Sequence, residues 1–207
     1  MKNMRLSLEE GKILVKIARK AIIEYLEKGI IISPPSEVSE NLLKKMGVFV
    51  TLNAIREYGK ELRGCIGYPQ PIFPLIEATI RSAISAATED PRFPPVEINE
   101  MDNIIIEVSV LTVPQLIEVD DPREYPKKIK IGEDGLIVEK GFYRGLLLPQ
   151  VAIEWNWDEE EFLCQTCIKA GLDPSSWLDK KVKIYKFQAQ IFEEESPNGE
   201  IFERKIA

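Results

Sequence analysis

The short segment Leu62–Gly67 carries the residues whose types and spacing are best suited to chemistry. It reads Leu-Arg-Gly-Cys-Ile-Gly, so Cys65 lies between two glycines and follows Arg63 by two residues. If the segment is a β-strand, residues two apart share a face, and the Arg63 guanidinium would flank the Cys65 thiol. A nearby cation lowers a thiol pKa from about 8.5 towards neutrality, which favours the nucleophilic thiolate. We therefore take Cys65 as a candidate nucleophile and Arg63 as its thiolate-binding or anion-binding partner.

The two glycines of this segment offer a second kind of chemistry. Gly64 and Gly67 allow close backbone approach, and their amides could hold an anion or a developing oxyanion. We count both among the candidate ligand-binding residues. The competing interpretation is that Cys65 is a small buried hydrophobic residue in a tight turn, which needs no ligand. Spacing alone leaves both interpretations open.

A second motif, Asp90-Pro91-Arg92-Phe93, follows a predicted helix and could supply a proton-transfer group. Side chains at a helix end can face a cleft, so Asp90 is the candidate that moves protons and Arg92 is a candidate ligand-binding residue. The alternative is a helix-terminating turn held by a local salt bridge. Further carboxylates near turns or strand ends are weaker candidates for a base: Glu89, Glu107, Asp134 and Glu154.

Cys164 and Cys167 form a Cys-x-x-Cys pair, which invites a redox or zinc interpretation. A zinc site needs about four ligands, and the chain has neither a second such pair nor any histidine. A redox pair normally opens a helix beside a strand, whereas these cysteines lie in the middle of a predicted helix. We expect core cysteines here, and neither a metal nor a cofactor. The lack of histidine also excludes Cys–His and Ser–His catalysis.

The overall composition limits the classes of partner. With 207 residues, the chain suits one domain or two small subdomains. Its net charge of −7 argues against DNA and, less strongly, against RNA as a partner. The sequence contains no run of about 18 apolar residues and no signal peptide, so we expect a cytoplasmic protein without membrane contact. Abundant Ile, Glu and Lys resemble a thermophile's composition.

Periodicity and turn signals predict the elements that must position these residues. Helices are expected over residues 7–28, 39–46, 74–88 and 158–170. Strands are expected over residues 48–56, 61–68, 104–112 and 182–193, with short strands within 128–148. Ser7 and Glu10 form a capping box for the first helix, and Gly29 follows its end. The polar tail after Ser196 is expected to be peripheral.

The order of these elements predicts an α+β fold with mainly antiparallel sheets and flanking helices. Helices and strands are interspersed without regular βαβ spacing, and hairpin turns recur. The Pro-rich stretch Asp120–Pro126 is the expected seam between two subdomains. We therefore predict a larger subdomain of residues 1–119 plus 180–207, and a smaller one of residues 120–179.

The same residues make the chain resemble the AMMECR domain family, named after the Alport syndrome, midface hypoplasia, mental retardation and elliptocytosis chromosomal region. The matching segments follow the family's order over nearly the whole chain: Gly47–Leu52, Leu62–Gly67, Asp90–Pro95, Glu107–Leu111, Gly135–Ile137, Leu148–Ala152 and Cys167–Leu172. The resemblance implies an α+β fold of two subdomains that form a cleft, with Leu62–Gly67 facing it. It implies no assigned activity.

Carried over residue by residue, the resemblance adds Gln150 to the candidate ligand-binding residues of the cleft. Many relatives carry a histidine in the turn where this chain has Asp134, so a mechanism that uses that histidine as a general base is in doubt here. Some members are linked to Memo-like and radical-SAM proteins, which implies a shared pathway with such partners.

Two functions follow from these residues. In the first, an enzyme binds a small metabolite in the cleft, and Cys65 attacks it while Arg63 holds an anionic group and Asp90 moves protons. In the second, a non-catalytic module binds a protein segment or a small ligand within a larger assembly. The sequence alone does not decide between them.

Overall fold

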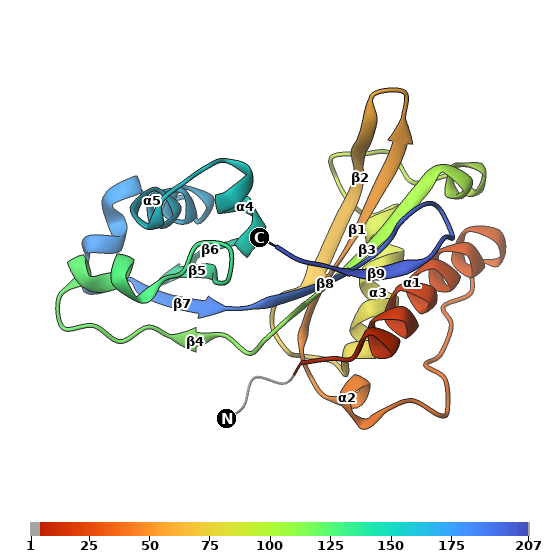
Figure 1. Ribbon diagram of the computed structural model, residues 1–207, viewed down its shortest axis with the longest axis horizontal. Helices are drawn as coiled ribbons and strands as arrows, with labels where there is room; N and C mark the ends of the chain where they lie inside the picture. Colours follow the sequence, from red (N-terminus) through yellow and green to blue (C-terminus); the bar gives the residue numbers. More distant parts are fainter. Residues whose placement is uncertain (1–4, 207) are drawn as a thin grey trace. The chain divides into compact units, whose positions relative to one another are not determined.

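The computed structural model describes residues 5–206 and forms two compact units (Figure 1). The first unit contains the chain up to Leu111 together with Gln190–Lys205, and the second consists chiefly of Thr112–Ala189. The unit boundaries therefore differ from the predicted ones after residues 119 and 179. The reason is that strands on both sides of the predicted seam pair with each other and belong to the second unit.

The first unit is built on a five-stranded sheet with the strand order β2-β1-β3-β8-β9. Its strands are β1 (Gly47–Arg56), β2 (Gly59–Tyr68), β3 (Ile104–Leu111), β8 (Ala189–Glu194) and β9 (Ile201–Arg204). β1 pairs antiparallel with both β2 and β3, and β8 pairs antiparallel with β9. The predicted hairpin of β1 and β2 is confirmed.

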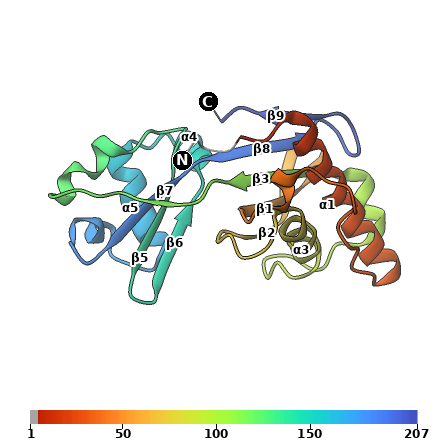
Figure 2. The same ribbon diagram turned by 90° about the horizontal axis from the view of Figure 1, so that it is seen from below.

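Two long helices cover one face of this sheet, and Figure 2 shows them side by side. They are α1 (Leu8–Lys28) and α3 (Leu75–Thr88), and the short α2 (Glu40–Leu43) and the 3-10 helix η1 (Ile98–Asn103) complete the unit. The predicted cap of α1 is confirmed, because the Ser7–Glu10 capping box is present and Gly29 ends the helix with φ 67°.

Alternation along β1 separates the two faces of the five-stranded sheet. Val48, Val50 and Leu52 are fully buried and belong to the core beneath α1 and α3. The residues between them, such as Thr51, therefore point to the face away from the helices. We call this the helix-free face, and it carries part of the candidate site.

The second unit has its own four-stranded sheet, with the order β4-β7-β5-β6. The strands are β4 (Gln115–Leu116), β5 (Gly135–Lys140), β6 (Tyr143–Leu147) and β7 (Lys183–Phe187). The helices are α4 (Pro149–Glu154), α5 (Glu159–Lys169) and the 3-10 helices η2 (Pro122–Lys128) and η3 (Pro174–Leu178). Their shared core includes Leu136, Phe162 and Ile184, each fully buried.

The α+β fold with antiparallel sheets is confirmed, and three local predictions are wrong. The predicted strand over 182–193 is two strands, because β7 pairs within the second unit and β8 within the first. The tail after Ser196 is not peripheral, since it forms β9 and buries Ile201. The predicted seam at Asp120–Pro126 lies mostly within η2 of the second unit. The predicted cleft between subdomains stays a prediction.

None of the helices formed by residues 5–206 is long and apolar enough to cross a membrane.

Candidate functional site

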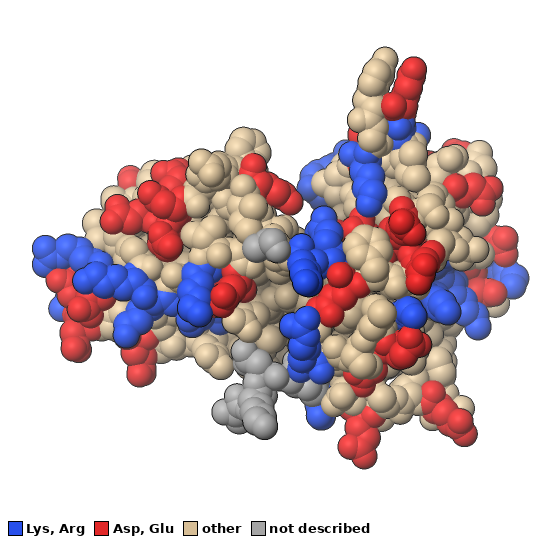
Figure 3. All heavy atoms as spheres, in the orientation of Figure 1, with Lys and Arg blue, Asp and Glu red and all other residues tan. Residues whose placement is uncertain are grey.

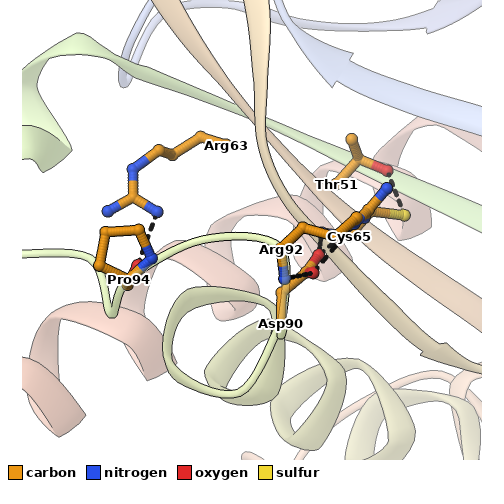
Figure 4. A network of polar contacts seen from close by, with 6 residues as sticks. All are labelled: Thr51, Arg63, Cys65, Asp90, Arg92 and Pro94. Carbon is orange, nitrogen blue, oxygen red and sulfur yellow. Dashed lines mark hydrogen bonds and ion pairs between the residues drawn. The ribbon is translucent and has the colours of Figure 1, made fainter.

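A bulge in β2 determines where Arg63 lies relative to Cys65. The register shifts between Leu52 and Asn53 of β1, so Arg63 is an extra residue that has no partner in the pairing. The alternation that predicted a shared face is interrupted between Arg63 and Cys65. Figure 4 shows the guanidinium directed towards Pro94 and away from the thiol. The predicted contact between the Arg63 guanidinium and the thiol is therefore wrong.

Arg63 instead ties the segment after α3 to the strand. Its Nε and Nη2 donate to the two carboxylate oxygens of Glu100, each at 2.9 Å. Nη1 donates to the carbonyl of Pro94 at 2.9 Å, and Nη2 also reaches the carbonyl of Pro95 at 3.3 Å. The side chain is only 10% exposed. A buried guanidinium whose charge is balanced by a bidentate carboxylate has a structural role here.

Asp90 also ties the segment after α3 to β2, by accepting the backbone N–H of Cys65. Its Oδ2 accepts the Cys65 backbone N–H at 2.8 Å and the Arg92 Nη2 at 2.7 Å (Figure 4). Its Oδ1 accepts the Arg92 Nε at 3.0 Å and the Arg92 backbone N–H at 3.1 Å. We call these contacts among Asp90, Arg92 and the Cys65 amide the Asp90 clamp. It covers a backbone donor on an edge strand of the sheet.

The electrostatics of the Asp90 clamp oppose proton transfer by its carboxylate. Hydrogen bonds from Arg92, together with those from the Cys65 and Arg92 amides, hold the pKa of Asp90 far below its usual range, although burial acts in the opposite direction. A carboxylate held in this way keeps its charge at neutral pH and is a weak base. The geometry of the Asp-Pro-Arg motif is therefore the one expected for a turn held by a local salt bridge, here between Asp90 and Arg92.

The Cys65 thiol is half-buried and lies on the helix-free face. The Thr51 hydroxyl, directly opposite in the β1–β2 register, donates to Sγ at 3.3 Å. Burial raises the pKa of Cys65, and it outweighs the Thr51 hydrogen bond and the Arg92 charge, which both lower it. The thiol is therefore protonated at neutral pH.

Close packing explains the two glycines of the motif. A Cβ on Gly64 would lie 2.1 Å from the carbonyl oxygen of Ala86, so β2 touches the backbone of α3 at this point. A Cβ on Gly67 would lie 2.2 Å from the carbonyl oxygen of Val48. Neither position tolerates a side chain without backbone movement. The proposed ligand contacts of these two amides stay a prediction.

The helix-free face carries a row of polar side chains that crosses three strands. In the register of the sheet, Cys65 lies opposite Thr51, and Thr51 lies opposite Glu107 of β3. Glu107 is 5% exposed, receives a hydrogen bond from Ser109 at 3.1 Å and forms an ion pair with Arg204 at 2.8 Å. Charged side chains such as Glu107 are rarely buried unless they are paired, so this row is a candidate for a functional role of the helix-free face.

Sequence reasoning missed Thr51 and Arg204 in this row. Strand alternation could have placed Thr51 on the face opposite Val50, but its register with Cys65 depends on the bulge. Arg204 lies in β9, within the tail that was expected to be peripheral, and no local signal linked it to Glu107.

The other predicted residues lie outside this row. Gln150 belongs to α4 of the second unit, and its buried Oε1 has no hydrogen-bond partner within the part of the chain that the structure describes. Asp134 is buried and accepts the Lys186 Nζ at 3.2 Å. Glu89 accepts the hydroxyl of Ser85, and Glu154 is exposed at the end of α4.

The Cys-x-x-Cys pair lies within α5, and both thiols are free. Cys167 is fully buried in the core of the second unit, and burial raises its pKa to about 11. Cys164 accepts the indole N–H of Trp177 at 3.4 Å. Among residues 5–206, no group of three or more His, Cys, Asp and Glu side chains could hold a metal ion.

The model of the AMMECR1 family matches residues 15–192. Protein PF1979 of Pyrococcus furiosus is 61% identical over 198 residues, which cover 95% of this chain and 94% of that protein. Protein MJ0810 of Methanocaldococcus jannaschii is 58% identical over 202 residues, which cover 97% and 98%. The crystal structure of the uncharacterized protein PH0010 from Pyrococcus horikoshii matches with 60% identity and a TM-score of 0.89, and covers 95% of this chain and 97% of that one. This chain therefore belongs to the AMMECR1 family.

Proposed function

We propose that this protein is a non-catalytic binding module that contacts a small polar ligand at the half-buried Cys65. The observation that carries the proposal is the engagement of the two side chains that a nucleophilic thiol would need. Arg63 is bound to Glu100, and the Asp90 carboxylate is bound to Arg92 and to the Cys65 amide. Arg63 is held away from the thiol, and the Asp90 carboxylate stays ionised near neutral pH, so it is a poor base for the thiol proton.

Arg92 supplies the charge that such a ligand would meet. Its side chain is 53% exposed, although it holds Asp90 through Nε and Nη2. Nη1 donates to no acceptor among residues 5–206, so it can bind an incoming acidic group. With the thiol and the Thr51 hydroxyl close to Arg92, the chemistry favours a small molecule that carries a carboxylate or a similar anion.

The second candidate is an enzyme in which Cys65 is the nucleophile. The Thr51 hydrogen bond to Sγ and the nearby Arg92 charge favour it, because both lower the thiol pKa. In this form of the hypothesis Arg92 replaces Arg63 as the thiolate partner. Burial of the sulfur opposes it, and a bound substrate would have to supply the missing stabilisation of the thiolate.

The proposal extends to the location and the macromolecular partners of the protein. We propose a cytoplasmic module that acts with Memo-like or radical-SAM proteins, as the family resemblance implies, and that binds neither DNA nor RNA. The net charge of −7 supports the last point. On the face drawn in Figure 3, Lys and Arg side chains gather in places, and Asp and Glu side chains lie beside and among them.

The pH dependence of Cys65 alkylation tests the choice between the two candidates. Iodoacetamide is added to the folded protein at a series of pH values, and modification is located by mass spectrometry. A binding module predicts slow modification below about pH 9, because the neutral thiol does not react. Rapid modification with an apparent pKa well below 8 would overturn the proposal in favour of the enzyme.

A thermal-shift screen against small carboxylates and phosphates tests the binding itself. A ligand of this site must stabilise the wild type and lose its effect in Arg92→Gln. The matched control is Arg123→Gln, because Asp121-Pro122-Arg123 repeats the same Asp-Pro-Arg arrangement on the surface of the second unit. Stabilisation that survives Arg92→Gln, or that disappears equally in both variants, contradicts a ligand at Arg92.

A further inference from the structure

A groove of about 320 Å³ lies in the first unit between α1 and the turn that joins β8 to β9. α1 contributes Lys16, Arg19, Lys20 and Ile23, and the hairpin contributes Asn198 and Ile201. Its volume is at the lower end of the range for small-molecule sites. Neither Cys65 nor any other residue of the candidate site lines it.

The base of this groove is a buried ion pair that is almost completely satisfied. The Arg19 Nε donates to Oε1 of Glu194 at 2.6 Å, and Nη2 donates to the other oxygen, which also accepts the Ile106 N–H at 2.9 Å. Arg19 further donates to the carbonyls of Met101 at 3.1 Å and Ile104 at 2.6 Å. Glu194 is thus neutralised, and one of the five guanidinium N–H groups has no partner among the described residues.

Two lysines place positive charge at the rim of the groove. Lys16 and Lys20 are exposed and lie one turn apart on α1. Neither lysine forms an ion pair with any residue that the structure describes. Glu24 also lines the groove but is paired with Lys28 at 2.9 Å. Glu9, which interacts electrostatically with Lys16, is paired with Lys12 at 2.8 Å. Two ammonium groups without an ion-pair partner among the described residues therefore lie at one groove, in a chain whose net charge is −7.

The remaining walls combine an apolar and a polar surface. Ile23 and Ile201 supply the apolar part, and Ile201 is 5% exposed. Asn198 has a positive φ of 57°, a conformation that asparagine adopts more readily than most residues, and it supplies a side-chain amide. A ligand in this groove would meet both charged and apolar side chains.

We propose that this groove binds a small organic phosphate. The phosphate group lies between the ammonium groups of Lys16 and Lys20, with the free Arg19 N–H and the Asn198 amide as additional donors. The carbon part of the ligand packs against Ile23 and Ile201. A phosphate suits two point charges better than a carboxylate, because it carries close to two negative charges and more acceptor oxygens at neutral pH.

Calorimetric titration of the full chain at low salt tests this site, with inorganic phosphate and propyl phosphate as probes. We expect saturable binding of both, with propyl phosphate the tighter by about threefold or more because part of its chain is removed from water. Lys16→Gln/Lys20→Gln weakens both by about tenfold or more. Both lysines are exposed, so the variant folds normally, whereas changes at the buried Arg19 would compromise stability.

The matched control is Lys127→Gln/Lys181→Gln, which removes two exposed charges from the second unit. Its affinity for phosphate remains within about twofold of the wild type. Absence of saturable binding by the wild type, or full affinity in Lys16→Gln/Lys20→Gln, overturns the proposal. An equal loss in both double variants also overturns it, since it would reflect net charge alone. Equal affinity for inorganic phosphate and propyl phosphate overturns the assignment of Ile23 and Ile201 as the surface that contacts the carbon part of the ligand.

Discussion

Replacing Asp90 by asparagine removes the charge of the Asp90 clamp while keeping its shape. Asparagine retains one acceptor oxygen, but its amide nitrogen replaces an oxygen that accepts from both Cys65 and Arg92. At that point donors would face donors. Asp90 is 5% exposed, so water cannot readily replace the lost contacts.

The magnitude follows from the hydrogen bonds that are lost. Charge-assisted hydrogen bonds contribute about 1.5–3 kcal/mol each, and a buried donor left without an acceptor costs about 1–3 kcal/mol. Arg92 is half-exposed and can turn towards water, so its share of the loss is small. We therefore expect Asp90→Asn to lower the free energy of unfolding by about 3 kcal/mol.

The chain contains its own control for this experiment. Asp121 holds Arg123 through the same contacts, with Nη2 to Oδ2 at 2.7 Å and the backbone N–H to Oδ1 at 3.0 Å. Arg123 is exposed, and within residues 5–206 the Asp121 carboxylate accepts no hydrogen bond from a neighbouring strand. Solvent screens this pair, so Asp121→Asn should leave the stability almost unchanged.

The pH dependence of the Asp90 effect has a definite sign. The pKa of Asp90 is depressed in the folded protein, so its contribution is fully present above the unfolded pKa of about 3.9 and is lost as pH falls below it. The stability difference between the wild type and Asp90→Asn should therefore be constant between about pH 5 and pH 7, and shrink below about pH 4.

Urea denaturation at several pH values measures the stability, and amide hydrogen exchange at Cys65 gives a local measurement. In Asp90→Asn the Cys65 amide should exchange faster, because its acceptor is lost. Equal destabilisation by Asp90→Asn and Asp121→Asn would refute the reasoning. So would an unchanged exchange rate at Cys65.

The remaining predictions concern the motif around the same strand. Gly64→Ala should cost about 3 kcal/mol or more, because the new Cβ meets a backbone oxygen at 2.1 Å. In the same denaturation assay Gly59→Ala should cost less, about 1–3 kcal/mol, since its Cβ meets open space and only its φ of 124° is unfavourable. Arg92→Gln should raise the pKa of Cys65, whereas Arg63→Gln should leave it unchanged. The pH dependence of Cys65 alkylation in the folded protein measures both. A shift caused by Arg63→Gln would show that its charge reaches the sulfur after all.

Short-range patterns in the sequence determined the individual elements well. Ser7, Glu10 and Gly29 delimit α1, because caps act within one turn of a helix. The alternation of residues 48–56 and the turn that follows predicted the β1–β2 hairpin for the same reason. These signals depend on neighbouring residues and need no knowledge of the rest of the chain.

The composition of the candidate site was only partly predictable. Cys65 and Asp90 were singled out by residue type, and the structure joins them through the Cys65 amide rather than through the thiol. The resemblance alone points to Gln150, and nothing in the sequence predicts that its buried Oε1 lacks a hydrogen-bond partner among the described residues. Side-chain partners that lie far apart in the chain leave no local pattern.

Tertiary structure alone decided the register and the sheet to which each strand belongs. One extra residue in β2 turned Arg63 towards Glu100, and the division of residues 182–193 between two sheets followed from their pairing partners. Likewise, Arg204 meets Glu107 only because β9 joins the edge of the sheet. The physical reason is that side-chain period and caps are local properties, whereas pairing register and buried ion pairs depend on the summed packing of distant segments.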